Sequence, residues 1–491
     1  MNQITGHRQV KTRHEIFYGI GDIFGGGSFI IIGMLFMFYL TEIAGLPPLL
    51  AGFVFAIGKV WDAISDPLMG YISDRTRTRF GRRRVYFLIG IIPITVSFFL
   101  MWVPVNLGST AALFAYYSLA YVLFSTVFTM VMVPYSALNA EMTGDYRIRS
   151  RMSGARSTFS GISSLIAGTI PKLIIDSFPG SPQKGYLVMA IAFGVFFALP
   201  WIIVFTGTWE LPFEQAREEK KSLSSIFSQF STILVNRSFR VHISMYIASY
   251  TAMDILMALF AYYLTYYVQK PGIFSIAMGS LMVTQILLFP LYVYIGNRKG
   301  KGTAYIIGLF VWATGMSLTL LLGPESSTAS IALVCVIIGA GTSAGVMIPW
   351  AMLPSIIDVD EIITGEKRSG LYSGAMTLVR KLVQGAIAMP LIGFMLDAIG
   401  FVSKQQQSAQ TLHGLKFFFL LGPALLIIAG IIAATRFRIT PETHAVLAGE
   451  IARLRQGGAK KDVGEDERKV CELITGLPYE RLFGGEGKNI S

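Results

Sequence analysis

The run AGFVFAIGKVWDAISDPLMGYI, residues 51–72, is long and apolar enough to lie within a membrane, yet it contains two carboxylates. Asp62, Ser65 and Asp66 have the i, i+3, i+4 spacing that places side chains on one face of a helix. A charged side chain near the middle of a bilayer costs at least about 2.5–3.5 kcal/mol, so such groups normally face a cavity and serve a function. Two carboxylates and a hydroxyl suit a small hard cation or a proton. The stretch therefore predicts a membrane helix that carries the cation site of a coupled transporter.

The composition is typical of a membrane protein. Of 491 residues, 53% are hydrophobic and only 14% are charged, which is too apolar for a soluble chain of this length. The net charge of +12 could indicate a nucleic-acid partner, but the basic residues lie between the apolar segments, as the positive-inside rule predicts. Cys335 and Cys471 give neither a disulfide framework nor a metal-binding spacing. Because the sequence also lacks a Walker loop, HExxH and a nucleophile elbow, we expect no enzyme, no cofactor and no nucleic-acid partner.

Twelve apolar segments are long enough to span a bilayer, judged against about 20 residues per crossing. Basic residues gather before the first segment and in alternate loops, including 75–84, 147–151 and 298–301. Because basic loops face the cytoplasm, we expect both termini on the cytoplasmic side of a plasma membrane of the bacterial inner-membrane type. The expected spans are 17–44, 47–74, 85–104, 109–140, 150–177, 184–206, 240–268, 272–296, 303–323, 328–357, 369–399 and 413–436.

A long charged loop, 207–239, divides these segments into two sets of six. The basic stretch GNRKGKG, 296–302, has the place in the second half that SDRTRTRFGRRR, 73–84, has in the first, which is a weak sign of repetition. Two six-helix bundles around a central site are the major facilitator architecture, an all-α membrane fold with twelve transmembrane helices. The expected parts are an N-terminal bundle at 1–206, a cytoplasmic central loop at 207–239, a C-terminal bundle at 240–436 and a cytoplasmic tail at 437–491.

Two stretches outside the bundles carry their own expectations. The amphipathic sequence SLSSIFSQFSTIL, 222–234, predicts a surface helix along the membrane within the central loop. The mixed-charge tail predicts a short helix near 442–456, followed by flexible sequence.

Four motifs extend the argument from chemistry to a family: YGIGD at 18–22, WDAISDPLMGYISDRTRTRFGRRR at 61–84, DYRIRSRMSGAR at 145–156 and TGEKRSGLYSGAMTLVRK at 364–381. Together they resemble the glycoside–pentoside–hexuronide:cation symporter family, the melibiose-carrier branch of the major facilitator superfamily. The similarity runs from about residue 14 to 436. The resemblance implies alternating access and inward movement of a solute with Na⁺, Li⁺ or H⁺.

The resemblance also assigns a cation site. The family's two cation carboxylates fall on Asp62 and Asp66, which makes them the expected Na⁺ ligands, and the polar residue between them falls on Ser65. A threonine of the fourth helix that assists the cation falls on Thr129. Two lysines complete the coupling machinery: Lys59, one turn before the first carboxylate, and Lys381 on the eleventh helix, between the cation and substrate sites. Two adjacent carboxylates repel each other without a cation or proton, which favours an ion over a purely structural knot of salt bridges.

The family's galactoside-binding positions are altered here. In the galactoside carriers, a carboxylate on the first helix and another on the fourth hold the sugar hydroxyls; these positions fall on Gly26 and Met132 in an ungapped alignment. An aromatic residue one turn later is replaced by Ser136. The coupling machinery is therefore present without the galactoside pair, and we expect simple α-galactosides to bind poorly.

Four other residues are candidates for the substrate cavity. Asp22 ends the YGIGD motif, and Arg156 is expected to pair with acidic groups near the gate. Asp254 interrupts a Tyr-rich seventh helix and could bind a solute, pair with Lys381, or hydrogen-bond a neighbouring tyrosine, for which Tyr250 and Tyr263 are the candidates. Trp350 on the tenth helix is either a stacking platform for a solute or an ordinary packing residue.

A last group concerns gating. Of Arg380 and Lys381, about 100° apart on a helix, we expect only one to point inward. Asp74, Arg75 and Arg82 resemble the facilitator loop that latches helix ends on the cytoplasmic side, although plain topology also explains these charges.

These observations lead to one main hypothesis, a monomeric symporter that imports a glycoside, pentoside or uronide with Na⁺ rather than H⁺. A sodium-coupled transporter of a lysophospholipid or other lipid-like solute is the alternative within transport. A non-transporting membrane sensor on the same fold is a third class, which the buried charges disfavour.

Overall fold

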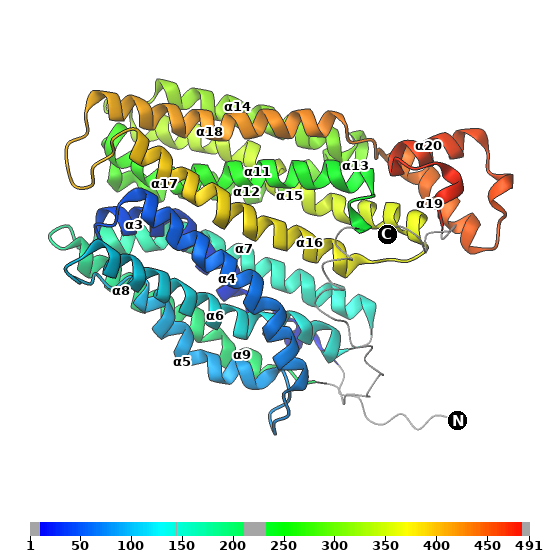
Figure 1. Cartoon of the computed structure of the whole chain (residues 1–491), viewed down its shortest axis with the longest axis horizontal. Coiled ribbons are helices and arrows are strands. Elements are labelled where there is room, and N and C mark those ends of the chain that lie inside the picture. The colour runs from blue at the N-terminus through cyan, green and yellow to red at the C-terminus, as the bar shows by residue number, and fades with distance from the viewer. Residues whose placement is uncertain (1–9, 144, 211–231, 484–491) are drawn as a thin grey trace.

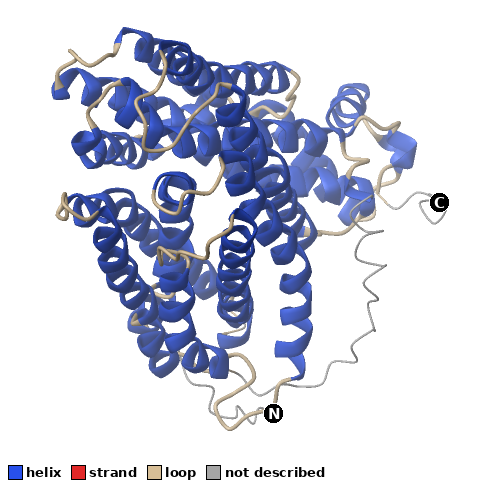
Figure 2. Cartoon of the chain, turned by 60° about the vertical axis from the view of Figure 1, so that its left-hand side comes forward, coloured by secondary structure: helices blue, strands red, loops and turns tan. Residues whose placement is uncertain are grey.

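The computed structural model describes residues 10–143, 145–210 and 232–483, and this part of the chain is helical without a strand (Figures 1 and 2). Within these residues, eleven helices are long and apolar enough to cross a membrane. The shorter apolar helix Arg84–Leu100 has the third place, so the predicted order of twelve spans is confirmed. The central-loop helix predicted at 222–234 lies almost wholly outside the described residues, so it stays a prediction, as does the position of the boundary between the two halves.

The first six spans are built from ten helical elements. The first span, Thr12–Glu42, is divided into α1 (Thr12–Gly19), α2 (Asp22–Ile31), the π-helical turn η1 (Ile32–Phe36) and α3 (Met37–Glu42). The others are α4 (Pro48–Arg75), α5 (Arg84–Leu100), α6 (Thr110–Met142), α7 (Tyr146–Asp176), α8 (Pro182–Ala198) and α9 (Pro200–Gly207), of which the last two form one span.

The last six spans follow the same plan. They are α11 (Arg237–Tyr262) with the π-helical turn η2 (Tyr263–Tyr267), α12 (Phe274–Leu287) with α13 (Phe289–Lys299), and α14 (Lys301–Leu318). The remaining elements are α15 (Thr328–Thr364), α16 (Ser369–Leu382) continued by the π-helical turn η5 (Val383–Ala388) and α17 (Met389–Ala398), and α18 (Ala409–Thr435).

Polar N-caps explain where several spans begin. Each capping side chain accepts a hydrogen bond from a backbone N–H of the first helical turn, which would otherwise have no partner in the helix. Asp145 accepts from the N–H groups of Arg147 and Ile148 and so starts α7 directly after α6. The residues that cap spans in this way are Ser109, Asp145, Asn236, Ser327 and Ser408.

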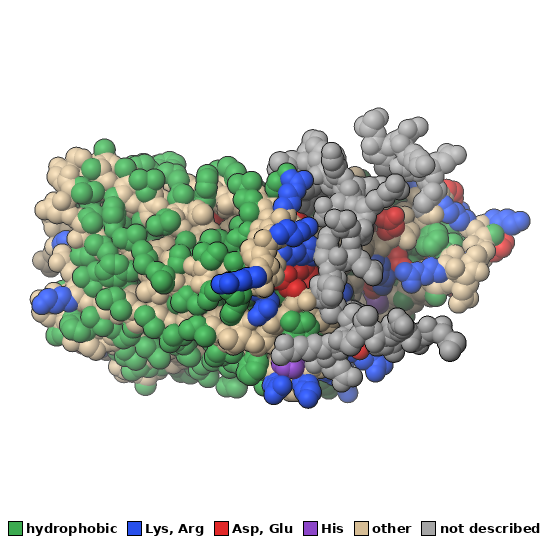
Figure 3. Space-filling model, turned by 90° about the horizontal axis from the view of Figure 1, so that it is seen from below, with side chains coloured by type: hydrophobic (Ala, Val, Ile, Leu, Met, Phe, Trp, Pro, Cys, Tyr) green, Lys and Arg blue, Asp and Glu red, His purple; other side chains and the backbone are tan. Residues whose placement is uncertain are grey.

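The outer surface matches a membrane environment. Ile92 on α5, Leu119 on α6 and Leu287 on α12 are strongly exposed, and they belong to a large set of exposed aliphatic side chains on the spans. In Figure 3, hydrophobic side chains are spread over the left part of the face that is seen, and most of the visible Lys and Arg side chains lie to the right of this area. Exposed apolar surface of this extent marks contact with a nonaqueous environment.

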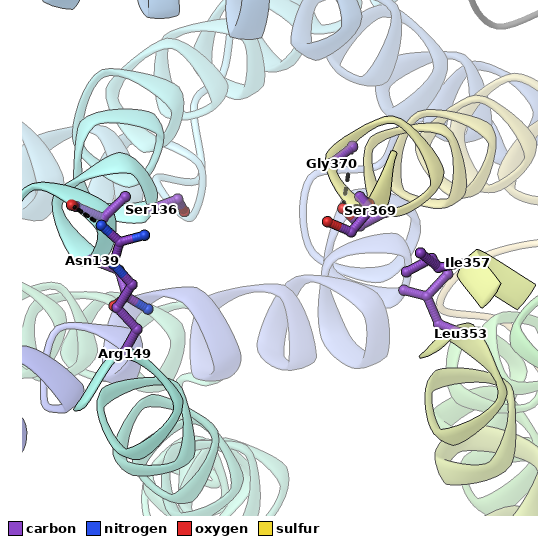
Figure 4. Close-up of a pocket in the computed structure, with 9 residues that line it drawn as sticks. Ser136, Asn139, Arg149, Leu353, Ile357, Ser369 and Gly370 are labelled. Carbon is purple, nitrogen blue, oxygen red and sulfur yellow. Dashed lines mark hydrogen bonds between the residues drawn. The ribbon is translucent and has the colours of Figure 1, made fainter. Parts of the chain in front are cut away.

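Figure 1 shows the two bundles diverging toward the end that carries α19 (Pro441–Arg455) and α20 (Glu465–Thr475). We call this the basic end, because the arginine-rich 75–84 segment lies there. A pocket of about 600 Å³ lies between the bundles at this end, lined by α6 and α7 from one bundle and α15 and α16 from the other (Figure 4).

The far end is closed by hydrogen bonds between the bundles. The hydroxyls of Thr41 and Tyr262 are 2.7 Å apart, and Tyr266 donates to Glu42 Oε2 at 2.6 Å. The backbone N–H of Lys404 donates to the same oxygen at 3.2 Å. The structure is therefore open between the bundles at the basic end and closed at the far end.

The tail differs from its prediction. The helix near 442–456 is confirmed as α19, but the sequence after it is folded: α20 follows, and Cys471, Ile474 and Leu482 are buried. The backbone N–H of Phe483 donates to Ile362 O at 2.6 Å, which attaches the tail to α15. The sparse apolar residues of the tail share one face, so a low mean hydropathy concealed an amphipathic helix. Burial raises the pKa of the Cys471 thiol to about 12, so this thiol is unreactive at neutral pH.

Candidate functional site

The two carboxylates of α4 lie against α6. Thr129 Oγ1 donates to Asp66 Oδ1 at 2.7 Å, and Ser65 Oγ donates to Thr129 Oγ1 at 3.3 Å. Asp62 is fully buried, whereas the side chain of Asp66 is 31% exposed. The four residues predicted as a cation site are therefore brought together by one helix–helix interface.

Two lysines balance the charge of these carboxylates. Lys381 Nζ, which comes from the other bundle, is 2.5 Å from Asp66 Oδ2 and 3.9 Å from Asp62 Oδ2. Lys59 Nζ is 3.4 Å from Asp62 Oδ2 and lies over the ring of Phe29. An ammonium thus lies where a cation that bound both carboxylates would lie.

Asp62 Oδ1 is buried and has no hydrogen-bond partner among the described residues. An unpartnered carboxylate oxygen in a buried site is costly, so such atoms commonly mark a site for an ion or a water molecule. The donor set of carboxylate and hydroxyl oxygens is the one that hard cations prefer. The residues present therefore fit a small cation such as Na⁺.

The close approach of the two bundles at this site depends on Gly385 in η5. A Cβ atom at this position would lie 2.1 Å from Lys59 Cβ, which is far below any tolerated contact. Glycine therefore lets η5 pass directly beside α4. This contact holds the C-terminal turn of α16, with Lys381, against the carboxylates of the first bundle.

A cavity of about 760 Å³ lies between the bundles beside this cluster, with Lys59 and Lys381 in its wall. Asp22, Arg156, Asp254 and Trp350, all predicted as cavity residues, line it as well. Arg156 Nε donates to Asp22 Oδ1 at 3.0 Å, and Arg156 Nη1 donates to Ser136 Oγ at 3.2 Å. The expected pairing of Arg156 with an acidic group is thus observed, and its partner is Asp22.

The partner of Asp254 differs from the expectation. Arg380 Nη1 and Nη2 donate to Asp254 Oδ2 and Oδ1 at 2.5 and 2.9 Å, and Gln384 Nε2 donates to Oδ1 at 2.9 Å. Lys381, the partner proposed from sequence, is occupied by the carboxylates of α4 instead. Because Arg380 and Lys381 both line the cavity, the expectation that only one points inward is wrong. The two side chains diverge from α16, one toward α11 and one toward α4.

The tyrosines proposed as partners of Asp254 donate elsewhere. Tyr263 donates to Thr319 O, and Tyr250 donates to Val346 O at 3.3 Å while it accepts from Trp350 Nε1 at 2.8 Å. Trp350 is 41% exposed and lines the cavity, so it offers an aromatic surface in the cavity wall.

Gly26 and Met132 are outside the set of described residues that line the cavity. A Cβ at Gly26 would lie 2.3 Å from Ser160 Oγ and 2.6 Å from Ser160 O, so Gly26 faces α7 at a tight crossing. Met132 is buried, and its Cε lies beside Gly25. Neither residue therefore lies in the cavity wall of this structure. The ungapped alignment gave the residue numbers, but the face of each helix is decided by how closely α2 approaches its neighbours.

The predicted latch lies within the first bundle. Asp74 pairs with Arg83, and Arg82 Nη2 donates to Glu141 Oε1 at 2.7 Å. Arg75 contacts the ring of Tyr71 instead of a carboxylate. The charges of 74–84 thus fasten α4, α5 and α6 together at the basic end.

Sequence reasoning missed two residues that contact the predicted ones, Glu210 and Gln384. Glu210 accepts from the backbone N–H groups of Arg82, Arg83 and Arg84, and so caps the start of α5. Gln384 could have been predicted, because it follows Arg380 by one helical turn and so lies on the same face of the helix. Glu210, by contrast, is far away in sequence and carried no such signal.

Comparison with known proteins agrees with this geometry. The family model described as MFS/sugar transport protein matches residues 17–441. The chain belongs to this family. It is therefore a multi-pass membrane protein of the major facilitator type, and the resemblance to a symporter family within that superfamily is confirmed.

Relatives and a solved structure of this kind cover most of the chain. An uncharacterized symporter of Synechocystis, sll1374, is 25% identical over 93% of this chain and 99% of its own length. A putative sulfoquinovose importer of Salmonella typhimurium is 28% identical over 92% of this chain and 94% of its own. The crystal structure of a D-xylose–proton symporter, 16% identical, superposes with a TM-score of 0.62 over 86% of this chain and 96% of its own, which shows the shared fold.

Proposed function

We propose that the chain is a cation-coupled symporter that imports an anionic sugar-type solute by alternating access, with Na⁺ as the coupling ion. The observation that carries the proposal is the position of the Lys381 ammonium, 2.5 Å from Asp66 and 3.9 Å from Asp62, in the wall of a cavity between the bundles. The names of the two relatives, a symporter and a putative sulfoquinovose importer, favour the same class of function.

Coupling follows from competition for the two carboxylates. Na⁺ and the Lys381 ammonium cannot both lie against Asp62 and Asp66, because like charges repel at this distance. Binding of Na⁺ therefore releases the ammonium toward the cavity, which it already lines. A negatively charged solute can then pair with the Lys381 ammonium, whose charge was balanced by the two carboxylates before the ion bound.

The charge balance of the site favours a solute with a single negative charge. Among the described residues, four carboxylates and four basic side chains lie in or beside the cavity, so their formal charges cancel. One Na⁺ adds a positive charge, and a monoanionic solute restores neutrality before the carrier reorients. An uncompensated charge in a buried site carries a penalty of several kcal/mol, so the neutral loaded state is the one that can move. The eight residues are Asp22, Lys59, Asp62, Asp66, Arg156, Asp254, Arg380 and Lys381.

The remaining parts of the proposal concern location. The basic end, where the bundles diverge, is assigned to the cytoplasm because its arginine-rich segment obeys the positive-inside rule. In this assignment the structure is open to the inside, both termini are cytoplasmic, and the protein works as a monomer in a plasma membrane of the bacterial inner-membrane type. It requires no cofactor besides the coupling ion and no nucleic-acid partner.

The experiment measures thermal unfolding of the purified protein in Na⁺ and in choline at equal ionic strength. A ligand that binds only the folded state stabilises it by an amount that grows with concentration, so Na⁺ should raise the melting temperature. The shift should vanish in Asp66→Asn. If stability depends on pH and not on Na⁺, H⁺ is the coupling ion; if neither cation matters, the proposal of coupling fails.

A lipid-like solute is the second candidate, and one observation favours it. Phe29, Ile286 and Phe289 line part of the cavity, where they offer an apolar wall that a simple sugar does not need. The candidates are separated by adding melibiose, a glucuronide or a lysophospholipid as a competitor in one Na⁺-dependent uptake assay. If only the lysophospholipid inhibits uptake, the proposed solute is a lipid and not a sugar.

A further inference from the structure

Arg380 is the cavity residue whose role the coupling mechanism leaves open. It lies next to Lys381 on α16, yet it pairs with Asp254 of its own bundle and not with Asp62 or Asp66. Its guanidinium is also 4.5 Å from the ring centroid of Tyr250, so an aromatic face supports it from one side. A planar, supported guanidinium is well suited to bidentate recognition of a carboxylate.

The two partners of this ion pair are unequally accessible. The Arg380 side chain is 23% exposed, whereas that of Asp254 is 8% exposed. Asp254 keeps a second partner, since Gln384 donates to its Oδ1 at 2.9 Å. Arg380 can therefore rotate toward an incoming anion while Asp254 remains hydrogen-bonded, so the cost of an unpartnered buried carboxylate is reduced.

The residues around Arg380 indicate which class of solute would carry the anionic group. Trp350 and Tyr250 form one aromatic wall beside Arg380, linked by the hydrogen bond from Trp350 Nε1 to the Tyr250 hydroxyl. On the other bundle, Ser157, Ser160 and Ser164 line the cavity with hydroxyl groups. An aromatic surface, hydroxyl partners and a supported guanidinium suit a sugar ring that bears a carboxylate.

We propose that Arg380 is the residue that selects a sugar carboxylate over a neutral sugar, with Asp254 as the internal anion that holds the guanidinium until the solute arrives. This inference rests on the proposed function and names the group that the solute presents. The solute carboxylate replaces Asp254 on the guanidinium, and Asp254, still bound by Gln384, accepts a hydrogen bond from a sugar hydroxyl. The guanidinium keeps an anionic partner throughout, and the bound Na⁺ of the proposed mechanism offsets the negative charge that the solute adds.

The test compares methyl β-D-glucuronide with methyl β-D-glucoside, which differ at one carbon, as stabilising ligands of the purified protein in saturating Na⁺. The wild type should bind the glucuronide at the lower concentration. In the double variant Asp254→Asn/Arg380→Gln, which leaves neither charge unpaired, the preference should fall about ten- to a hundredfold, the range of a lost charged hydrogen bond. Arg298→Gln, which removes an arginine at the protein surface, serves as the matched control and should keep the preference.

The outcomes separate this inference from the proposed function. A double variant that retains the Na⁺-dependent shift and loses the glucuronide preference supports the role of Arg380. An unchanged preference in the double variant, or a wild type that is stabilised equally by both sugars or by neither, overturns that role. A wild type without any Na⁺-dependent shift contradicts the proposed coupling, whatever the sugars do.

Discussion

Replacement of Lys381 by methionine tests the competition between ammonium and ion. Methionine keeps a long unbranched side chain but removes the charge that lies 2.5 Å from Asp66 Oδ2 and 3.9 Å from Asp62 Oδ2. The loss of one partner from a fully buried pair costs about 3–5 kcal/mol. Because the Asp66 side chain is 31% exposed, we instead take the value of a charged hydrogen bond, about 1.5–3 kcal/mol.

The free energy of the lost Lys381 ion pair, about 1.5–3 kcal/mol, should appear as tighter binding of Na⁺. In the wild type the ion must displace the ammonium, whereas in Lys381→Met the carboxylates lack this competitor. Since about 1.4 kcal/mol corresponds to a tenfold change, the half-saturating Na⁺ concentration should fall about ten- to a hundredfold. Without Na⁺ the variant should melt at a lower temperature than the wild type, because two carboxylates then share only the charge of Lys59.

Two measurements check the prediction. Melting temperatures across a Na⁺ series, with choline to hold the ionic strength, give the apparent affinity, and Lys172→Met serves as control because Lys172 pairs with Asp176 away from the site. Uptake into vesicles should show that Lys381→Met no longer concentrates solute, because Na⁺ binding releases no ammonium. An unchanged or higher half-saturating Na⁺ concentration would refute the competition.

Three further substitutions test other parts of the structure. Asp62→Asn should abolish the Na⁺-dependent rise in melting temperature and also lower stability by about 3–5 kcal/mol, because buried Lys59 loses its ion-pair partner; unchanged stability would contradict this. Glu42→Gln should loosen the closed far end, so that a cysteine at Thr265→Cys reacts faster with an impermeant maleimide than in the Glu42 background. Gly26→Asp should destabilise the protein by about 1–3 kcal/mol without conferring melibiose binding, because its side chain would collide with α7; a gain of binding would show that this position faces the cavity.

The fold and the cation cluster follow from local patterns in the sequence. Apolar runs of about twenty residues predict spans whatever their neighbours are, because the bilayer alone sets their length. Asp62, Ser65 and Asp66 were predictable for a similar reason, since a spacing of three and four residues fixes a shared helix face. Neither inference needs knowledge of how one helix packs against another.

The remaining assignments depend on packing between helices, which the sequence does not display. Gly26 faces α7 because the two backbones approach too closely for a side chain, and an alignment gives no information about that approach. A pair with Lys381 was one of the alternatives for Asp254, but η5 passes so close to α4 that Lys381 reaches the first bundle and leaves Arg380 for Asp254. The errors are therefore errors of helix rotation and proximity.

The two adjacent basic residues of α16 offer a short physical route between ion and solute. Lys381 holds the carboxylates of the first bundle, while Arg380 holds Asp254 of the second, and a single helix carries both side chains. In the proposed mechanism, Na⁺ takes the place of the ammonium, so α16 loses an ion pair between the bundles and the cavity gains one positive charge. Both consequences act at the same place, since the freed ammonium and the guanidinium line one cavity. The proposed coupling therefore needs no long pathway through the protein: the ion would change the charge that the solute meets and the contact that the bundles must break.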